Sequence, residues 1–217
     1  MKLLIANRGE IAVRIMRSAA ELNIRTVAIY SEDDHQSLHT RRADESVALK
    51  GTGIEPYLDI DQVLKAASDT DCTAIHPGYG FLSENAIFAD RCLENDLIFV
   101  GPSAETLRTL GDKASARKLA EECGVPLLTG TSNPVTLADA EDFFKSLKPG
   151  QSMMIKAIAG GGGRGMRIVH DLDDLEAAFD RCQSEARQAF GNDSVYVEQL
   201  MTKGRHIEIQ VIGDGTG

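Results

Sequence analysis

Short apolar runs alternate with amphipathic stretches along the first hundred residues of the chain. The apolar runs are typical of β-strands and lie at residues 3–6, 25–30, 45–49, 74–76 and 98–100. The stretches between them place apolar residues at helical spacing, and they lie at residues 10–22, 60–67 and 86–94. This β-α-β alternation predicts a parallel sheet with helices on both faces.

The pattern changes after residue 100. Residues 104–123 predict a single helix that ends at Gly124, and residues 130–134 predict a loop. Thr136 is expected to cap a second helix, and either Asp171 or Asp173 a third, long one. Further strands are predicted at residues 153–157, 166–169 and 195–198. The second part of the chain is therefore expected to be a small α+β module built on a hairpin with a glycine-rich tip.

The end of the chain alternates between polar and apolar residues. Residues 205–212 predict a strand with His206, Glu208 and Gln210 on one face. The turn signal at residues 213–217 is not followed by a second strand, and an unpaired sheet edge is unfavourable. We therefore expect the chain to be a fragment of a longer protein.

Charge and hydropathy narrow the classes of function. The 217 residues include 23 Lys and Arg against 33 Asp and Glu, which gives a formal net charge of −10. An acidic chain is a poor match for nucleic acid or for an anionic membrane surface, since both attract basic proteins. The first apolar run stops at Ala6, too early for a signal peptide. We expect a cytoplasmic protein with neither nucleic acid nor membrane as its partner.

The four cysteines are widely spaced, and no two of them form a C-x-x-C pair. This spacing argues against a zinc site or a disulfide framework. We expect free, buried thiols at Cys72, Cys92, Cys123 and Cys182.

The strongest local motif is the glycine loop at residues 160–165. It contains G-x-G-x-x-G, but a dinucleotide site needs a helix after the loop, and residues 166–169 predict a strand. The simplest alternative is a flexible hairpin tip. However, four successive glycines exceed the need of a tight hairpin, and a bare backbone can approach a polyphosphate closely. Arg164 adds a charged donor inside the loop.

Three other residues are candidates for ligand contact, each with a plain structural alternative. Lys156 lies in a largely apolar strand four residues before the loop, where it either reaches a bound phosphate or is a solvated edge lysine. Lys113, taken alone, has the features of a surface lysine. His206 is either a ligand or part of a solvated strand face.

Taken together, five segments resemble the biotin carboxylase component of biotin-dependent carboxylases, a branch of the ATP-grasp superfamily. They occur in the family's order along the whole chain: IANRGEIAVRI (5–15), HPGYGFLSEN (76–85), FVGPSAETLRTLGDK (99–113), IKAIAGGGGRGM (155–166) and RHIEIQV (205–211). Their joint presence is far more specific than any single glycine motif.

The resemblance implies an α/β fold class with a particular domain order. A Rossmann-like parallel-sheet domain is expected at residues 1–100, followed by a helical linker at 101–127. The small α+β ATP-grasp lid then corresponds to residues 128–200. Residues 201–217 correspond to the incomplete start of the C-terminal ATP-grasp domain.

The resemblance also implies an activity, the ATP-dependent carboxylation of biotin. ATP and bicarbonate form a carboxyphosphate, and the carboxyl group passes to biotin on a carrier protein or domain, with Mg²⁺ or Mn²⁺ as cofactor and a carboxyltransferase as partner. The residues that match ATP contacts are Lys113, Lys156, Gly161, Gly162, Gly163, Met166, Glu198, Gln199, Leu200, Met201 and His206. Tyr79 and Gly80 match the loop near the biotin ring, and Arg17 and Glu21 match a homodimer contact.

Some of the family's functional residues have no counterpart in this chain. The resemblance places the catalytic residues and the metal ligands after Gly217, so we expect none of either here and no turnover by the isolated chain. One alternative is another ATP-grasp ligase, of the carbamoyl-phosphate synthetase type, although HPGYGFLSEN favours the biotin branch. A second alternative is a non-catalytic fragment that only binds nucleotide or dimerises.

Overall fold

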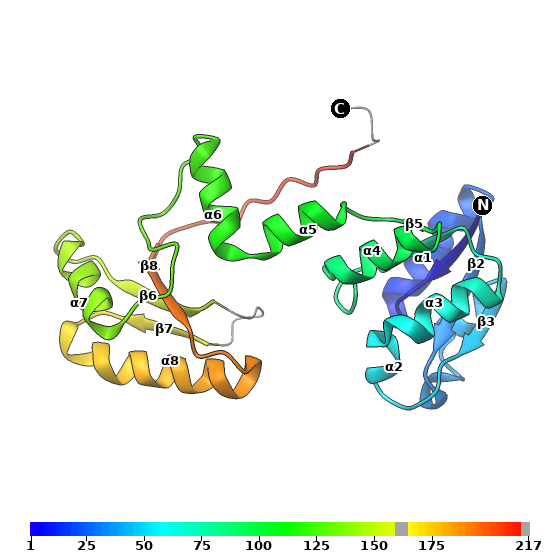
Figure 1. Ribbon diagram of the computed structural model, residues 1–217, viewed down its shortest axis with the longest axis horizontal. Helices are drawn as coiled ribbons and strands as arrows, with labels where there is room; N and C mark the ends of the chain where they lie inside the picture. Colours follow the sequence, from blue (N-terminus) through cyan, green and yellow to red (C-terminus); the bar gives the residue numbers. More distant parts are fainter. Residues whose placement is uncertain (159–164, 214–217) are drawn as a thin grey trace. The chain divides into compact units, whose positions relative to one another are not determined.

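The chain folds into two compact units, Met1–Asp112 and Lys113–Gly217, shown in Figure 1. The computed structural model describes residues 1–158 and 165–213, apart from the side chains of Lys113, Ala114 and Phe190. Each unit has its own sheet and is described by itself.

The first unit contains a five-stranded parallel sheet with the strand order β3-β2-β1-β4-β5. The strands are β1 (Lys2–Ile5), β2 (Arg25–Tyr30), β3 (Glu45–Ala48), β4 (Ala74–His76) and β5 (Ile98–Phe99). In the central register Leu4 pairs with Val27 on one side and with Ile75 on the other. The predicted parallel sheet is confirmed, and its strand order reverses direction between β1 and β4.

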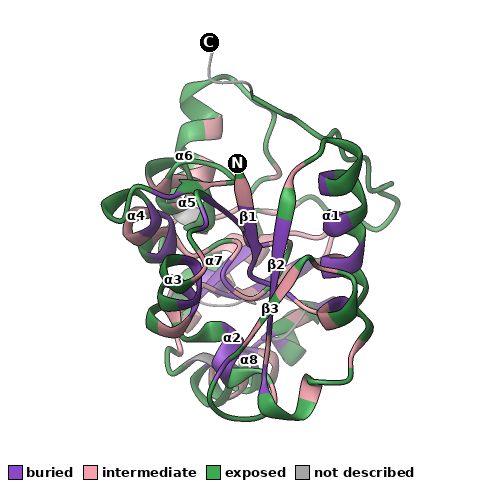
Figure 2. Cartoon of the chain, turned by 90° about the vertical axis from the view of Figure 1, so that its right-hand side faces the viewer, coloured by how far each residue is buried: buried purple, intermediate pink, exposed green. Residues whose placement is uncertain are grey.

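Helices cover both faces of this sheet. Helix α1 (Gly9–Glu21) packs on one face against Leu3, Ile5 and Ala28. The larger core cluster lies on the other face with α2 (Glu55–Leu58), α3 (Ile60–Asp69) and α4 (Ala86–Glu94). Figure 2 shows the buried residues of α1 on the side toward the strands. The first unit also contains α5 (Ala104–Gly111) and the short 3-10 turns η1 (Glu32–Asp34) and η2 (Leu38–Arg41).

The single helix predicted at residues 104–123 is wrong. The chain forms α5 and then α6 (Lys113–Glu122), because Asp112 adopts an extended backbone with φ −89° and ψ 117°. Glycine and aspartate are poor helix formers, so Gly111 followed by Asp112 is a weak point. The predicted stop is confirmed: Gly124 has φ +69°, and the Val125 amide donates to the Ala120 carbonyl at 2.8 Å.

The second unit is a three-stranded antiparallel sheet with two helices on one face. The strand order is β7-β6-β8, with β6 (Met153–Ala157) between β7 (Met166–Val169) and β8 (Val195–Gln199). Apolar residues of the three strands form one core with α7 (Leu137–Ser146) and α8 (Leu175–Phe190). Thr136 caps α7 in a capping box with Asp139, as predicted. The α+β module is therefore confirmed.

The cap predicted for the long helix is wrong. A 3-10 turn, η3 (Leu172–Asp174), leads directly into α8, and Asp174 occupies the N-cap position without a side-chain hydrogen bond. Neither Asp171 nor Asp173 caps α8, because η3 continues directly into the helix and moves the N-cap position to Asp174.

The strand predicted at residues 205–212 is also absent. Residues 201–213 are exposed and without regular secondary structure, and His206, Glu208 and Gln210 do not form one face of a strand. A strand needs a neighbour to accept and donate its backbone hydrogen bonds, and none of the described residues pairs with this segment.

The cysteine prediction holds for three of the four residues. All four thiols are free, and Cys72, Cys92 and Cys182 are buried, but Cys123 is exposed. Cys123 lies after the end of α6, at the turn closed by Gly124, within a stretch of exposed residues from 121 to 127. Among the described residues, no helix has both the length and the apolar character needed to cross a membrane.

Candidate functional site

One face of the three-stranded sheet is turned away from α7 and α8 and carries the most distinctive chemistry. Met153, Ile155 and Ala157 of β6 are buried, the first two in the core with α7 and α8, so the alternate residues Met154 and Lys156 point to the opposite face. The strand register places Lys156 between Met166 and Tyr196, and Met154 between Ile168 and Glu198. We call these six residues the open face.

Lys156 and Glu198 form an ion pair on the open face. The Lys156 Nζ donates to the Glu198 Oε1 from the diagonal position of the β6–β8 register. The side chains are only 23% and 12% exposed. A charge this far from water is stable only when it is paired, and each residue supplies the partner of the other. The cation expected near the glycine loop is therefore held in place by a carboxylate.

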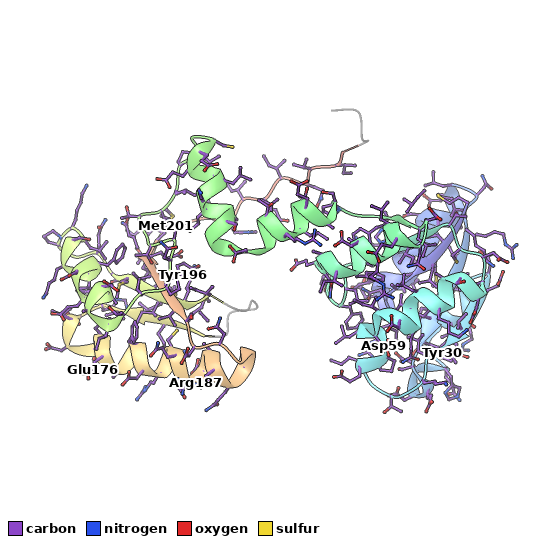
Figure 3. The ribbon with its side chains drawn as sticks, in the orientation of Figure 1. Tyr30, Asp59, Glu176, Arg187, Tyr196 and Met201 are labelled. Atoms are coloured by element: carbon purple, nitrogen blue, oxygen red, sulfur yellow. The ribbon has the colours of Figure 1, made fainter. Side chains whose placement is uncertain are left out.

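Tyr196 shares this environment, and Figure 3 labels it on β8. Its side chain is 7% exposed, and burial raises the pKa of the phenol to about 12. The nearby Glu198 carboxylate also raises that pKa, whereas the charge of Arg117 lowers it. The phenol therefore stays neutral beside the ion pair.

Arg117 on α6 was not identified from the sequence. Its Nη2 donates to the Leu128 carbonyl at 2.9 Å, while its Nε is buried and has no hydrogen-bond partner among the described residues. Buried donors are normally satisfied, so this Nε is a group that could receive an acceptor from a ligand. The signal available in the sequence was spacing, because Arg117 follows the candidate Lys113 by four residues, which is about one helical turn.

The segment at residues 129–135 runs along the outer edge of β8. The Thr131 amide donates to the Val197 carbonyl at 2.8 Å, and the Gln199 amide donates to the Thr129 carbonyl at 2.8 Å. A side chain at Gly130 would lie 2.9 Å from the Glu198 Cβ and from the Val197 carbonyl oxygen. The loop predicted at 130–134 thus acts as an extra edge of the sheet, and Gly130 permits its close approach beside Glu198.

The chain continues from β8 through Gln199, Leu200 and Met201. The Leu200 amide donates to the Ser152 carbonyl at 2.8 Å, which ties this connection to the start of β6. Met201 is 59% exposed and is labelled just beyond β8 in Figure 3. The backbone predicted to contact a nucleotide base therefore follows directly from the open face.

The structure does not bring every predicted nucleotide contact together. Gly161, Gly162, Gly163 and the side chain of Lys113 lie outside the described residues, although Lys113 begins α6. His206 has an 87% exposed side chain, and its Nε2 lies 4.0 Å from the exposed Glu208 carboxylate. The residues that do meet on the second unit are Lys156, Met166 and Glu198, with Gln199, Leu200 and Met201 at the end of β8.

Two further predicted sites lie on the first unit. Tyr79 and Gly80 are exposed in the loop after β4, with Tyr79 at 67% exposure. Arg17 and Glu21 are exposed on α1, but no ion pair joins them among the described residues. An arginine that precedes a glutamate by four residues is the weaker orientation for such a pair.

The open face offers the chemistry that a nucleotide needs. Lys156 supplies a fixed positive charge suited to phosphate oxygens. Met166 and Ile168 add polarizable apolar surface of the kind that lines ligand sites, and they are 36% and 47% exposed. In the parts of the chain that the structure describes, no three His, Cys, Asp or Glu side chains converge as a metal site would require.

Comparison with known protein families assigns both units. Residues 1–107 match the family described as biotin carboxylase, N-terminal domain, and residues 112–217 match the carbamoyl-phosphate synthase L chain, ATP binding domain. Among curated proteins, the chain is 50% identical to pyruvate carboxylase of Bacillus subtilis (strain 168), with all of this chain and 19% of that protein covered. Urea amidolyase of Lachancea kluyveri is 49% identical over 99% of this chain and 12% of its own length.

Solved structures give the same assignment. A biotin carboxylase–β-γ-ATP complex from Campylobacter jejuni matches with a TM-score of 0.88 and 38% identity, covering 93% of this chain and 45% of that one. The biotin carboxylase domain dimer of Hydrogenobacter thermophilus 2-oxoglutarate carboxylase, solved with MgADP and bicarbonate, matches with a TM-score of 0.85 and 37% identity, covering 91% and 43%. The chain spans about a fifth of the pyruvate carboxylases and under half of these solved chains. The chain belongs to the biotin carboxylase family and corresponds to its N-terminal portion.

Proposed function

We propose that this chain provides part of the MgATP site of an enzyme that carboxylates biotin at the expense of ATP. The observation that carries the proposal is the Lys156–Glu198 pair on the open face, directly before the Gln199–Met201 connection. Two solved relatives support it, since one was solved with an ATP analogue and the other with MgADP and bicarbonate.

In this proposal different residues of the second unit contact different parts of the nucleotide. Lys113 and Lys156 contact the phosphates, and Gly161, Gly162 and Gly163 cover them. Met166 packs near the adenine, and the backbone from Glu198 to Met201 reads the edge of the base. His206 completes the contacts from the segment after β8. Phosphoryl transfer depends mainly on positioning and on neutralised charge, which is the work that fixed lysines and backbone amides perform.

The remaining assignments extend the proposal beyond the nucleotide. Mg²⁺ or Mn²⁺ would accompany ATP and neutralise phosphate charge, with its protein ligands supplied from outside the described residues. Tyr79 and Gly80 would lie near the biotin ring, and the acceptor would be biotin on a carrier protein or domain that also serves a carboxyltransferase. The cytoplasm is the proposed location, α1 with Arg17 and Glu21 is the proposed homodimer contact, and the proposed domain boundaries are residues 100, 127 and 200.

A titration with matched lysine variants tests the nucleotide site. Calorimetry with MgATP is carried out on the chain itself, on Lys156→Met and on Lys145→Met. Lys145 is a suitable control because its ion pair, with Glu141, lies on the exposed surface of α7. We expect Lys156→Met to weaken binding at least tenfold and Lys145→Met to leave it unchanged. Equal affinity in all three proteins would contradict the proposal.

One other function has a specific observation in its favour. The match of residues 112–217 to an ATP binding domain of carbamoyl-phosphate synthase type is compatible with an ATP-grasp ligase that does not use biotin. The two candidates differ at the loop that carries Tyr79, which belongs to the first unit. A response of this loop to free biotin would favour the biotin carboxylase reaction over the alternative.

A further inference from the structure

The loop that carries Tyr79 has an unusual backbone. Three of its four residues from 78 to 81 have positive φ: Gly78 at +69°, Gly80 at +68° and Phe81 at +45°. Glycine adopts this conformation freely, but at Phe81 the Cβ makes a positive φ strained. Such a conformation persists only where the surrounding structure fixes it, so the contacts around the loop need an explanation.

Asn7 provides contacts of this kind from the connection between β1 and α1. It is 1% exposed, and its Nδ2 donates to the Pro77 carbonyl at 2.7 Å and to the Tyr79 carbonyl at 3.0 Å. Its Oδ1 accepts from the Arg8 amide at 2.9 Å, which fixes the orientation of the side-chain amide. One buried side chain therefore holds the loop on both sides of Gly78.

Gly78 is fitted to this arrangement. A Cβ at position 78 would lie 2.7 Å from the Asn7 Nδ2 and 2.8 Å from the Ile11 Cγ2. The Gly78 amide also donates to the His76 Nδ1 at 3.0 Å. Both the positive φ and the close approach to Asn7 therefore require glycine here.

The other end of the loop is anchored separately. The Phe81 ring stacks on Tyr57 with the ring centroids 5.5 Å apart, and Leu82 is 2% exposed. Tyr57 is itself held by a 2.8 Å hydrogen bond from its hydroxyl to Asp34. Between these two anchors the Tyr79 side chain is 67% exposed.

We infer that Asn7 is a positioning residue that sets the geometry of the loop at residues 77–81 and, through it, of Tyr79 and Gly80. This inference rests on the proposed function for its consequence, because that function places the biotin ring beside these two residues. β1 and β4 are adjacent where the strand order of the sheet reverses, which is the place where open α/β sheets bind ligands. Asn7 thus couples the turn that begins α1 to the loop expected to receive biotin.

Amide hydrogen exchange measured by NMR tests the positioning role. The reporters are the Gly78 amide and the Ser83 amide, which donates to the Gly80 carbonyl at 2.9 Å. The variants are Asn7→Asp, which replaces the donating Nδ2 by an acceptor oxygen facing the two carbonyls, and Gly78→Ala, which disturbs the same contact from the loop side. Asn95→Asp is the matched control, since the side-chain amide of Asn95 donates to the Arg91 carbonyl at the exposed end of α4, away from this loop in the sequence.

We expect hydrogen exchange at the amides of residues 78 and 83 to become at least tenfold faster in both loop variants. This acceleration is measured relative to the amides of β1 and β2. The control should leave this ratio unchanged. Using the core strands as reference separates a local effect from a general loss of stability. Loop amides that keep the wild-type ratio in both variants would overturn the inference.

Free biotin at millimolar concentration distinguishes the positioning of the loop by Asn7 from the binding of biotin beside Tyr79 and Gly80. In the wild-type chain it should slow exchange in the loop, and in Asn7→Asp this protection should fall at least fivefold. Protection that persists undiminished in Asn7→Asp would overturn the role of Asn7 in biotin binding. A wild-type loop without any response to biotin would overturn the proposed function of Tyr79 and Gly80, while the exchange ratios above would still decide whether Asn7 holds the loop.

Discussion

Replacement of Lys156 by methionine should destabilise the second unit, because Lys156 is the cation that pairs with Glu198 among the described residues. The Glu198 side chain is 12% exposed and lies beside the buried Tyr196, so the carboxylate would lose its partner with little water to replace it. Breaking a fully buried pair costs about 3–5 kcal/mol. Lys156 is 23% exposed, so solvent weakens the pair, and we expect about 2 kcal/mol for Lys156→Met.

The carboxylate side of the pair should matter less. Glu198→Gln leaves a lysine that is more exposed than its partner and can turn toward water, so we expect about 1 kcal/mol. The double variant removes the charge pair without leaving either group alone. Its destabilisation should therefore be smaller than the sum of the two single changes by about 1 kcal/mol.

Hydrogen exchange at the amides of β6 and β8 measures this effect in the second unit alone. A loss of about 2 kcal/mol corresponds to an acceleration of about 30-fold, because a factor of ten is about 1.4 kcal/mol. Lys145→Met is the control, since its pair with Glu141 lies in solvent on the surface of α7 and should contribute little to stability. An acceleration below threefold in Lys156→Met, or strictly additive effects in the double variant, would refute the reasoning.

Three further predictions concern other parts of the molecule. Burial lowers the pKa of His39 and His76 below the ordinary 6.5, so the unfolded chain binds more protons as the pH falls through 6.5. The stability of the first unit should therefore stay constant above pH 7 and decrease below pH 6.5. A urea unfolding midpoint that is no lower at pH 5.5 than at pH 7.5 would contradict this. Gly130→Ala should destabilise the second unit by about 1–3 kcal/mol, because the new Cβ meets the backbone of β8, and unchanged exchange in β8 would argue against that packing. A thiol reagent at pH 8 should modify the exposed Cys123 rapidly and the buried Cys92 and Cys182 slowly. Burial raises the pKa of Cys92 to about 12 and that of Cys182 to about 11, so both stay as unreactive thiols. Fast labelling of either in the folded chain would contradict their burial.

Local patterns were sufficient to predict most of the regular structure. Residues 25–30, 74–76 and 153–157 coincide with strands β2, β4 and β6, because short apolar runs between turn signals leave few other conformations. Thr136 also caps α7 as predicted, since its hydroxyl and the Asp139 carboxylate need only each other and the adjacent backbone. Features fixed within a few residues are visible in one sequence.

The errors arose where the structure depends on distant partners. Residues 205–212 have the alternation of a strand, yet no other described segment lies beside them to complete a ladder. The break at Asp112 divides α5 from α6 although apolar residues recur at helical spacing on both sides of it. Periodicity reports which face of a segment is apolar, not whether the neighbouring element or an uninterrupted backbone is present.

The candidate site shows the same division. Lys156 was recognised as a cation near a glycine loop, but its ion pair with Glu198 joins residues 42 positions apart and follows only from the β6–β8 register. The role of Asn7 likewise depends on the Pro77 and Tyr79 carbonyls, 70 and 72 positions away. Sequence motifs indicated the ligand classes, and the pairing of strands supplied the contacts that position the residues.

Photoaffinity labelling with 8-azido-ATP and Mg²⁺ tests the central claim, that nucleotide binds to the second unit at the open face. The labelled chain is digested, and the modified peptides are identified with and without excess ATP. We predict ATP-protected labelling within residues 154–201, next to Met166 or the Gln199–Met201 connection, and its loss in Lys156→Met but not in Lys145→Met. ATP-protected labelling confined to the first unit, at the carboxyl ends of its parallel strands, would contradict the assignment.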